Sequence, residues 1–392
     1  MRDCTWLGKI ALAVALLVVT ACGGSASPPV RPGSAPAATT QSPASDATAA
    51  PLSASAEWDE VLAQARQEGH VVIDVPPEVG DKYRTAFQAV GERYGFTVET
   101  RTTSTGDTAP VILRECGVGR PSLDVVLGGM SEAFEVYPRG CLSSVKAMLL
   151  PEIADPANWR EGVLKFQDPD GEYLLQLGEY VTGVLIYNSE RLQSQDVATS
   201  RDLLKPELKR KIASHDPRQA GGGRGLATYL LDVLGPDYIR QLYLGQDVAR
   251  TSDQRQLAEW IARGVYWVGL GSVERGIEPL RQEGLPIGVT RLTDLPGYVS
   301  GGTTVLKVPK DPPHPNAAKV MVNWMASRDG QKAMMEIVGQ PSRRTDVEPT
   351  PNIPPYRLLE PGVHYEKEDY DFDFYTRRRP EATKTLLEIL GR

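Results

Sequence analysis

Cysteine, histidine and clustered positive charge are all scarce in this sequence. Its 392 residues include 4 cysteines and 4 histidines, and the formal net charge is −7 at pH 7. The three consecutive arginines at 377–379 stand beside an acidic stretch, and no basic run is interleaved with aromatic residues. Because nucleic-acid binding depends on such positive patches, we expect no nucleic-acid partner.

Complete catalytic and metal-binding motifs are also missing. Gly269–Gly271 begins a dinucleotide fingerprint, but Glu274 stands where its third glycine belongs. Gly129–Ala133 lacks the second glycine of a nucleophile elbow, and Ser143–Lys146 lacks the motifs that accompany S-x-x-K. The histidines are scattered without a zinc-binding spacing, at His70, His215, His314 and His364. We therefore predict no catalytic residue, no metal ligand and no cofactor.

The one long apolar run lies at the N-terminus, from Ile10 to Val19 after Lys9. It is too short to span a bilayer as a mature helix and is typical of a signal-peptide core. The run ends in Val-Thr-Ala-Cys22, which resembles the lipobox of bacterial lipoproteins. That resemblance implies cleavage after residue 21, acylation of Cys22, and an exported protein anchored on the periplasmic or extracellular face of a membrane. An ordinary secretory signal with a chance cysteine is the alternative.

Residues 22–55 begin with Cys22 and are rich in alanine, serine, proline and threonine. Such a composition cannot bury enough apolar surface to offset the entropy of ordering. We interpret it as a flexible tether with a root-mean-square reach on the order of 30 Å. The folded part then begins near Glu57.

Cys4 would be removed with the signal peptide, which leaves Cys116 and Cys141 beside the lipid site. They form an even pair in an oxidising compartment, which favours a disulfide between them. Two buried free thiols are the alternative.

Apolar periodicity in the folded part alternates between the patterns of strands and helices. Helices are predicted at 57–69, 83–94, 109–116, 224–234, 237–244, 253–262, 314–326 and 330–338. Strands are predicted at 71–75, 96–100, 124–127, 180–187, 211–214, 265–268 and 286–289, with extended chain over 297–308. This order indicates two successive α/β units with largely parallel sheets flanked by helices.

Glycines follow three of the predicted strands, at 127–131, 216–224 and 269–272. Glycine lets a ligand approach the backbone closely, and free N–H groups at a helix start attract anions. Arg218 or Arg224 adds a charged donor to the second loop. Ligands of open α/β sheets bind outside the carboxyl ends of the strands, so these loops are candidate ligand contacts.

Several stretches together resemble the extracellular solute-binding proteins of ABC importers, in the iron(III)-type branch that also includes binders of small anions. The likeness covers about residues 57–345 and is carried by 58–75, 183–188, 204–224 and 314–331. It implies a monomer of the two-lobe, type 2 periplasmic-binding-protein fold. Lobe 1 would comprise 57–178 and 300–392, lobe 2 would comprise 183–295, and a ligand cleft would lie between them.

The resemblance also implies a function and a site. The protein would capture a small, anionic solute and deliver it to a membrane permease, without being an enzyme. Carried over position by position, the ligand-binding residues would be Pro77, Glu78, Ser104, Thr105, Gly129, Ser131, Arg218, Gly221, Gly222, Gly271, Ser272 and Tyr298.

One departure from the family concerns iron. Iron-binding members carry an adjacent tyrosine pair where this chain reads Gly271-Ser-Val-Glu-Arg275, which argues against direct iron(III) binding. An iron(III)-binding transport protein stays an alternative. So do an exported hydrolase that uses Ser131, Ser143 and Lys146, and a surface sensor, suggested by the acidic aromatic stretch 365–375.

Overall fold

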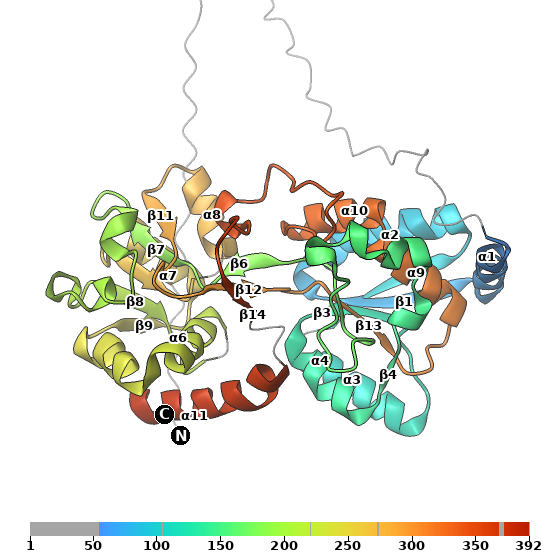
Figure 1. The fold of residues 1–392 in the computed structure, drawn as a ribbon, viewed down its shortest axis with the longest axis horizontal. Coiled ribbons are helices and arrows are strands. Elements are labelled where there is room, and N and C mark those ends of the chain that lie inside the picture. Colours follow the sequence, from blue (N-terminus) through green and yellow to red (C-terminus); the bar gives the residue numbers. More distant parts are fainter. Residues whose placement is uncertain (1–54, 104, 220, 273, 368–371, 392) are drawn as a thin grey trace, which may run out of the picture. The chain divides into compact units, whose positions relative to one another are not determined.

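The computed structural model describes residues 55–391, apart from residues 104, 220, 273 and 368–371 (Figure 1). The predicted signal peptide, Cys22, the tether up to residue 54 and Ser104 lie outside these residues. No helix in the described part of the chain combines the length and apolar character needed to cross a membrane.

The first sheet has the strand order β2-β1-β3-β13-β4, with β5 paired to β13. Strand β1 runs parallel to β2 and β3, whereas β13 runs antiparallel to β3, β4 and β5. The bounds are β1 (His70–Val75), β2 (Thr97–Thr102), β3 (Val125–Gly128), β4 (Leu142–Ser143), β5 (Leu175–Gln176) and β13 (Val305–Pro309).

Alternating side chains of these strands enter two apolar layers, one on each face of the sheet. Val71 and Ile73 pack with residues of four helices on one face, whereas Val72 and Val126 pack with two helices on the other (Figure 1). The first set is α1 (Ala56–Glu68), α2 (Gly80–Tyr94), α9 (Pro315–Ala326) and α10 (Arg328–Val338). The second set is α3 (Thr105–Val118) and α4 (Met130–Val136).

The second sheet has the order β11-β7-β10-β8-β9, and like the first it combines parallel and antiparallel strands. Strands β8, β9 and β10 are parallel, and β7 is antiparallel to β10 and β11. Its strands are β7 (Leu185–Asn188), β8 (Ile212–His215), β9 (Ala249–Thr251), β10 (Val268–Leu270) and β11 (Ile287–Thr290). Its helices are α6 (Gly222–Ile239), α7 (Gln254–Ala262) and α8 (Glu274–Gln282).

A third, small sheet holds the segments that run between the two larger ones. It comprises β6 (Tyr180–Thr182), β12 (Gly297–Ser300) and β14 (Tyr365–Lys367), in the order β14-β12-β6. The single strand predicted over 180–187 is two strands, because Gly183 between them has a φ of +68°. A Cβ at Gly183 would lie 2.9 Å from Cδ1 of Tyr298, so the turn also needs a glycine for space.

Short elements complete the chain. They are the helix α5 (Pro151–Ala154), the π-helical turns η9 (Arg240–Gly245) and η12 (Phe374–Arg378), and the helix α11 (Arg379–Leu390). The 3₁₀ turns are η1 (Pro77–Val79), η2 (Tyr137–Arg139), η3 (Lys146–Met148), η4 (Pro156–Asn158), η5 (Arg160–Gly162), η6 (Ser194–Val197), η7 (Asp202–Leu204), η8 (Pro206–Leu208) and η10 (Pro355–Arg357).

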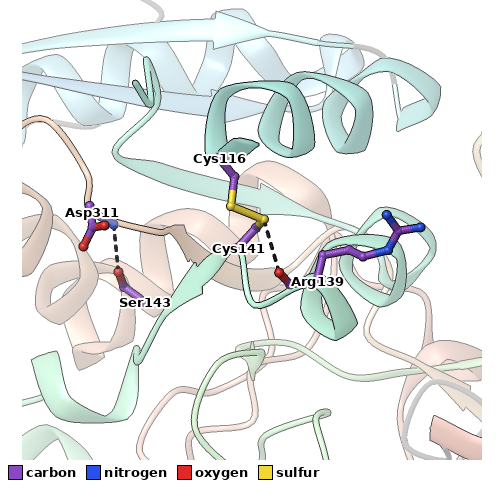
Figure 2. The surroundings of a disulfide bond; sticks show 5 residues. All are labelled: Cys116, Arg139, Cys141, Ser143 and Asp311. Atoms are coloured by element: carbon purple, nitrogen blue, oxygen red, sulfur yellow. Dashed lines mark hydrogen bonds between the residues drawn. A yellow bond between two sulfur atoms is a disulfide. The ribbon is translucent and has the colours of Figure 1, made fainter. Parts of the chain in front are cut away.

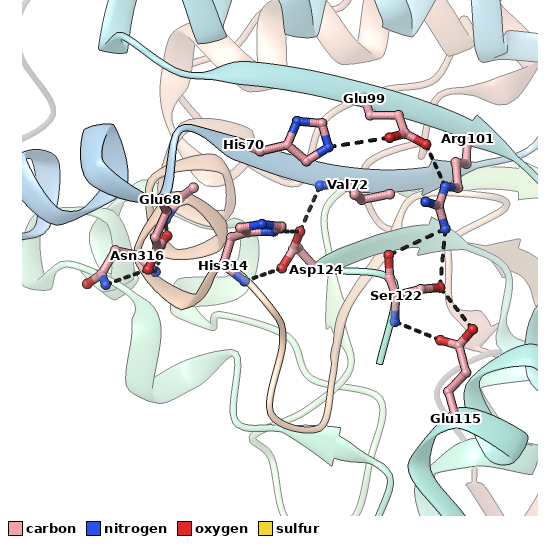
Figure 3. A network of polar contacts seen from close by, with 11 residues as sticks. Glu68, His70, Val72, Glu99, Arg101, Glu115, Ser122, Asp124, His314 and Asn316 are labelled. Carbon is pink, nitrogen blue, oxygen red and sulfur yellow. Dashed lines mark hydrogen bonds and ion pairs between the residues drawn. The ribbon is translucent and has the colours of Figure 1, made fainter. Parts of the chain in front are cut away.

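A buried carboxylate joins the first sheet to α9 (Figure 3). Asp124 accepts hydrogen bonds from the backbone N–H groups of Val72 and His314, each at 2.7 Å, and its Oδ2 lies 2.8 Å from Nδ1 of His314. Glu68 accepts from the N–H groups of Asn316 and Ala317 at the start of α9. These contacts show that His314 and Glu68 hold the start of a helix in place.

Cys116 and Cys141 form a disulfide, with their Cα atoms 5.7 Å apart (Figure 2). Cys116 lies in the last turn of α3, and Cys141 directly precedes β4. The bond therefore ties a helix on one face of the first sheet to that sheet's edge strand.

Replacing both Cys116 and Cys141 by serine should lower the free energy of unfolding by about 3.5 kcal/mol, since the bond closes a loop with a sequence separation of 25 residues. Urea denaturation followed by circular dichroism measures this change. Reduced wild-type protein is the matched control and should unfold at the midpoint of the double variant. A transition that is indifferent to reductant would contradict the prediction.

Candidate functional site

The predicted ligand residues of the first lobe lie at the carboxyl ends of parallel strands. Pro77 and Glu78 fall in η1 after β1, Thr105 begins α3 after β2, and Gly129 precedes α4 after β3, with Ser131 in the first turn of that helix. Because β1, β2 and β3 are parallel, these positions share one edge of the sheet.

A buried ion pair lies directly under the loop that follows β3. Lys307 of β13 is 0% exposed and Glu132 of α4 is 3% exposed. The Lys307 ammonium lies 3.1 Å from Oε1 of Glu132 and donates to the carbonyl of Gly129 at 3.2 Å. A Cβ at Gly128 would overlap this carboxylate, so only glycine fits there. The other oxygen of Glu132, Oε2, has no hydrogen-bond partner among the described residues.

A second buried carboxylate, Asp74, stands near the end of β1. The hydroxyl of Thr103 donates to its Oδ1 at 2.7 Å, and that of Thr108 donates to its Oδ2 at 3.4 Å. Burial raises the pKa of Asp74, and the two hydroxyls and the charge of Lys307 only partly offset that effect. The Thr103 hydroxyl, which follows β2 at the same edge of the sheet, is therefore bound to the protein itself.

In the second lobe, the loops after β8 and β10 are packed against each other through glycine. Gly221 has a φ of +131° and precedes α6. A Cβ at Gly223 would overlap the carbonyl oxygen of His215, and one at Gly271 would overlap Cα of Gly223. The predicted residues Gly221, Gly222, Gly271 and Ser272 are thus brought together at one edge of the second sheet.

His215, which ends β8, is buried, with 5% of its surface exposed. Burial lowers the pKa of His215. The N–H of Gly223 donates to its Nδ1 at 3.4 Å, which requires that nitrogen to be unprotonated. A neutral imidazole therefore supports the start of α6.

Arg218 is engaged by its own loop. Its Nε and Nη2 donate to Asp216 at 3.0 and 2.7 Å, and this pairing holds the pKa of Asp216 below its usual range. Arg224, the other arginine considered, donates to the carbonyls of Pro217 and Arg218. Both arginines therefore shape the loop before α6.

Two further predicted residues differ in their surroundings. The Ser272 hydroxyl is buried and has no hydrogen-bond partner in the part of the chain that the structure describes. Tyr298 is 6% exposed, and its ring stacks on Tyr229 of α6 with centroids 5.0 Å apart. Tyr298 lies on β12, a strand of the small sheet that runs between the two larger sheets, and its ring packs on α6. We therefore leave it out of the proposed ligand contacts.

Helices α4 and α6 begin without a side-chain cap, because neither receives a hydrogen bond from the side chain of its N-cap residue, which is Gly129 in α4 and Gly221 in α6. The same holds for α2, α9 and α11, and in α6 the N–H of Gly223 already donates to His215. By contrast, α1, α7 and α10 are capped by Ser55, Asp253 and Ser327. An uncapped helix start presents backbone N–H donors and the positive end of the helix dipole.

The buried polar residues Lys307, Glu132, Asp74 and His215 were missed as members of the site by sequence analysis. A lysine inside the apolar run Val305–Val308 is the one signal that could have identified them. Among the residues placed by the structure, no group of three or more histidine, cysteine, aspartate or glutamate side chains could hold a metal ion.

This architecture is the two-lobe periplasmic-binding-protein fold. A protein described as an ABC transporter of Clostridium perfringens has a TM-score of 0.65 and 15% identity, over 82% of this chain and all of its own. A Trichodesmium protein in complex with iron and citrate has a TM-score of 0.61 and 16% identity, over 83% and 100% of the two chains. The protein AfuA of Actinobacillus pleuropneumoniae, with fructose-6-phosphate bound, has a TM-score of 0.54 and 19% identity, over 81% and 97%.

The family profile of bacterial extracellular solute-binding proteins matches residues 82–360. The chain belongs to this family, which confirms the resemblance that the sequence indicated. It is therefore a bacterial extracellular solute-binding protein. The search among curated proteins found no match.

Replacing Lys307 by methionine should lower the free energy of unfolding by about 3–5 kcal/mol, because Glu132 is left as a buried, unpaired charge. Adding Glu132→Gln to that variant should restore part of the loss. Urea denaturation of the two single variants and the double variant gives the coupling. Lys310→Met, at an exposed position three residues along, should be neutral. A near-neutral Lys307→Met would refute a buried pair.

Proposed function

We propose that this protein captures a small organic anion between its two lobes and delivers it to its permease. The observation that carries the proposal is the pair of uncapped helices, α4 in the first lobe and α6 in the second, each entered through glycine after a strand. Backbone N–H groups at such starts bind phosphate and carboxylate oxygens. One uncapped helix in each lobe would let the ligand's acceptors be shared between the lobes.

The Ser272 hydroxyl supports the second-lobe half of this site. A buried hydroxyl without a partner costs free energy, about 1–3 kcal/mol, unless a ligand or water supplies the hydrogen bond. Ser272 directly follows Gly271, which touches the start of α6. A ligand oxygen at the N-terminus of α6 would therefore have a side-chain donor beside the backbone donors.

Iron(III) is the alternative ligand, because one similar structure is described with iron and citrate. The loop after β10 reads Gly271-Ser-Val-Glu-Arg275 and offers no phenolate to a hard cation. The family and the similar structures are transport proteins, and we propose that this chain likewise performs no catalysis.

We further propose that the protein acts as a monomer held on the membrane by a lipid on Cys22. The lipobox-like sequence before this residue supports the anchor, and the composition of residues 22–55 supports a tether. Tethering would raise the effective concentration of the binding protein at its permease without any new contact.

Cys22→Ser should release the protein from the membrane and leave ligand affinity unchanged, because the lipid lies outside the folded part. Membrane fractionation of cells that express the two forms, followed by immunoblotting, measures the release. A variant that still sediments with membranes would show that the anchor lies elsewhere.

Ser272→Ala should weaken ligand binding roughly five- to tenfold, since one hydrogen bond to the ligand is lost. It should not destabilise the free protein, in which this hydroxyl has no described partner. Thermal shift against phosphate esters, phosphonates and carboxylates measures both effects. A ligand at a hundred times its Kd adds about 2.7 kcal/mol of stability to the wild type.

The matched control is Ser189→Ala, at an exposed turn after β7, which should bind as the wild type does. Ferric citrate and a polyamine complete the panel. Stabilisation by either of these alone, with no response to any organic anion, would contradict the proposal.

A further inference from the structure

We infer that the C-terminal residues 364–367 and 372–390 form a clamp that holds the two lobes together and restrains their opening. The family profile ends at residue 360, so this segment lies beyond the family's common part. Its described residues contact the hinge, the second lobe and the first lobe in turn. From the sequence we expected residues 300–392 to belong to the first lobe alone, whereas α11 packs in the apolar core of the second lobe.

The first contact adds a strand to the hinge, by which we mean the strands β6 and β12 that run between the two lobes. Strand β14 pairs in parallel with β12, through Gly297–Tyr365, Tyr298–Glu366 and Val299–Lys367. The N–H of Gly297 also donates to the carbonyl of His364 at 2.8 Å. Strand β12 is paired on its other side with β6. The hinge therefore has three hydrogen-bonded strands, and it should resist bending more than two strands would.

The second contact anchors α11 on the second lobe. Leu386 is 0% exposed and Leu390 is 6% exposed, and both belong to the same apolar core as residues of α6. Arg378 lies 2.8 Å from Asp232 of α6. Figure 1 shows α11 alongside α6, with its N-terminal end directed towards α4. This half of the clamp is fixed by burial.

The third contact reaches the first lobe through aromatic rings. Phe372 and Tyr375 lie 5.0 and 4.8 Å from the ring of Phe134 in α4, centroid to centroid, and Phe372 also lies 5.6 Å from Tyr137. Phe134 is buried, whereas Phe372 and Tyr375 are only partly buried. The contact with the first lobe is therefore the weaker end of the clamp and the end that must part when the lobes separate.

The two helices that the clamp joins, α4 and α6, are the helices that begin at the glycine loops of the site. A segment fixed to α6 and resting on α4 opposes any motion that draws these helices apart. We therefore expect the ligand-free protein to sample open arrangements less when the aromatic contact is intact. This inference concerns lobe motion and holds whichever solute the site takes.

The test is the double variant Phe372→Ala/Tyr375→Ala, studied without ligand in the Cys22→Ser background so that no lipid disturbs solution scattering. Small-angle X-ray scattering should give a larger radius of gyration than for the parent. Amides of residues 372–378 should exchange with solvent on the order of tenfold faster, because three ring contacts are lost. Amides of residues 383–390 should keep their protection, which reports that α11 stays folded on the second lobe.

The matched control is Tyr173→Ala. Tyr173 packs on the same Tyr137 ring, with centroids 5.8 Å apart, but it belongs to the first lobe. Removal of the Tyr173 ring should leave the radius of gyration at the parent value. The inference is overturned if the double variant does not expand, if Tyr173→Ala expands it equally, or if residues 383–390 lose protection along with 372–378.

Discussion

The buried pair of Lys307 and Glu132 constrains how the whole chain is assembled. Desolvating two charges costs several kcal/mol per ion, so such a pair rarely adds net stability over apolar residues of the same size. What it does fix is position. Lys307 lies on β13, which follows the second crossing between the two larger sheets, whereas Glu132 and Gly129 precede the first crossing. The loop before α4 is therefore held by a residue that lies beyond both crossings in the sequence.

The second lobe reaches a similar loop by different means. There, Gly223 and Gly271 let two backbone segments and the neutral ring of His215 approach within contact distance. Any side chain at these glycines would push α6 away from β8. One lobe thus positions its helix start by a compensated charge pair, and the other does so by the absence of side chains.

Apolar periodicity was sufficient to predict most helices and strands of both lobes, because their buried residues recur with the period of a helix or of a strand. It failed where local sequence and tertiary contact disagree. The run 180–187 reads as one strand, yet Gly183 turns the chain so that Tyr298 can pack on Tyr229. Helix α11 was missed because its buried residues, Leu386 and Leu390, are few and stand among charged ones. The lysine inside the run Val305–Val308 is visible in the sequence, but its pairing with Glu132 could not be found by pattern, since the two residues are 175 positions apart.

The charges near the site have consequences for what the protein recognises. Lys307 is compensated by Glu132, and Arg218 by Asp216, so neither pair offers a full positive charge to a ligand. Among the described residues, the starts of α4 and α6 carry no N-cap side-chain bond and the Ser272 hydroxyl has no partner, whereas the N–H of Gly223 is taken by His215. Dipoles of this kind stabilise an anion at short range and with fixed directions. Selectivity would then follow the number and placement of a solute's oxygen acceptors more than its net charge. A carboxylate at the start of α4, that of Glu132, already occupies part of the favourable field there.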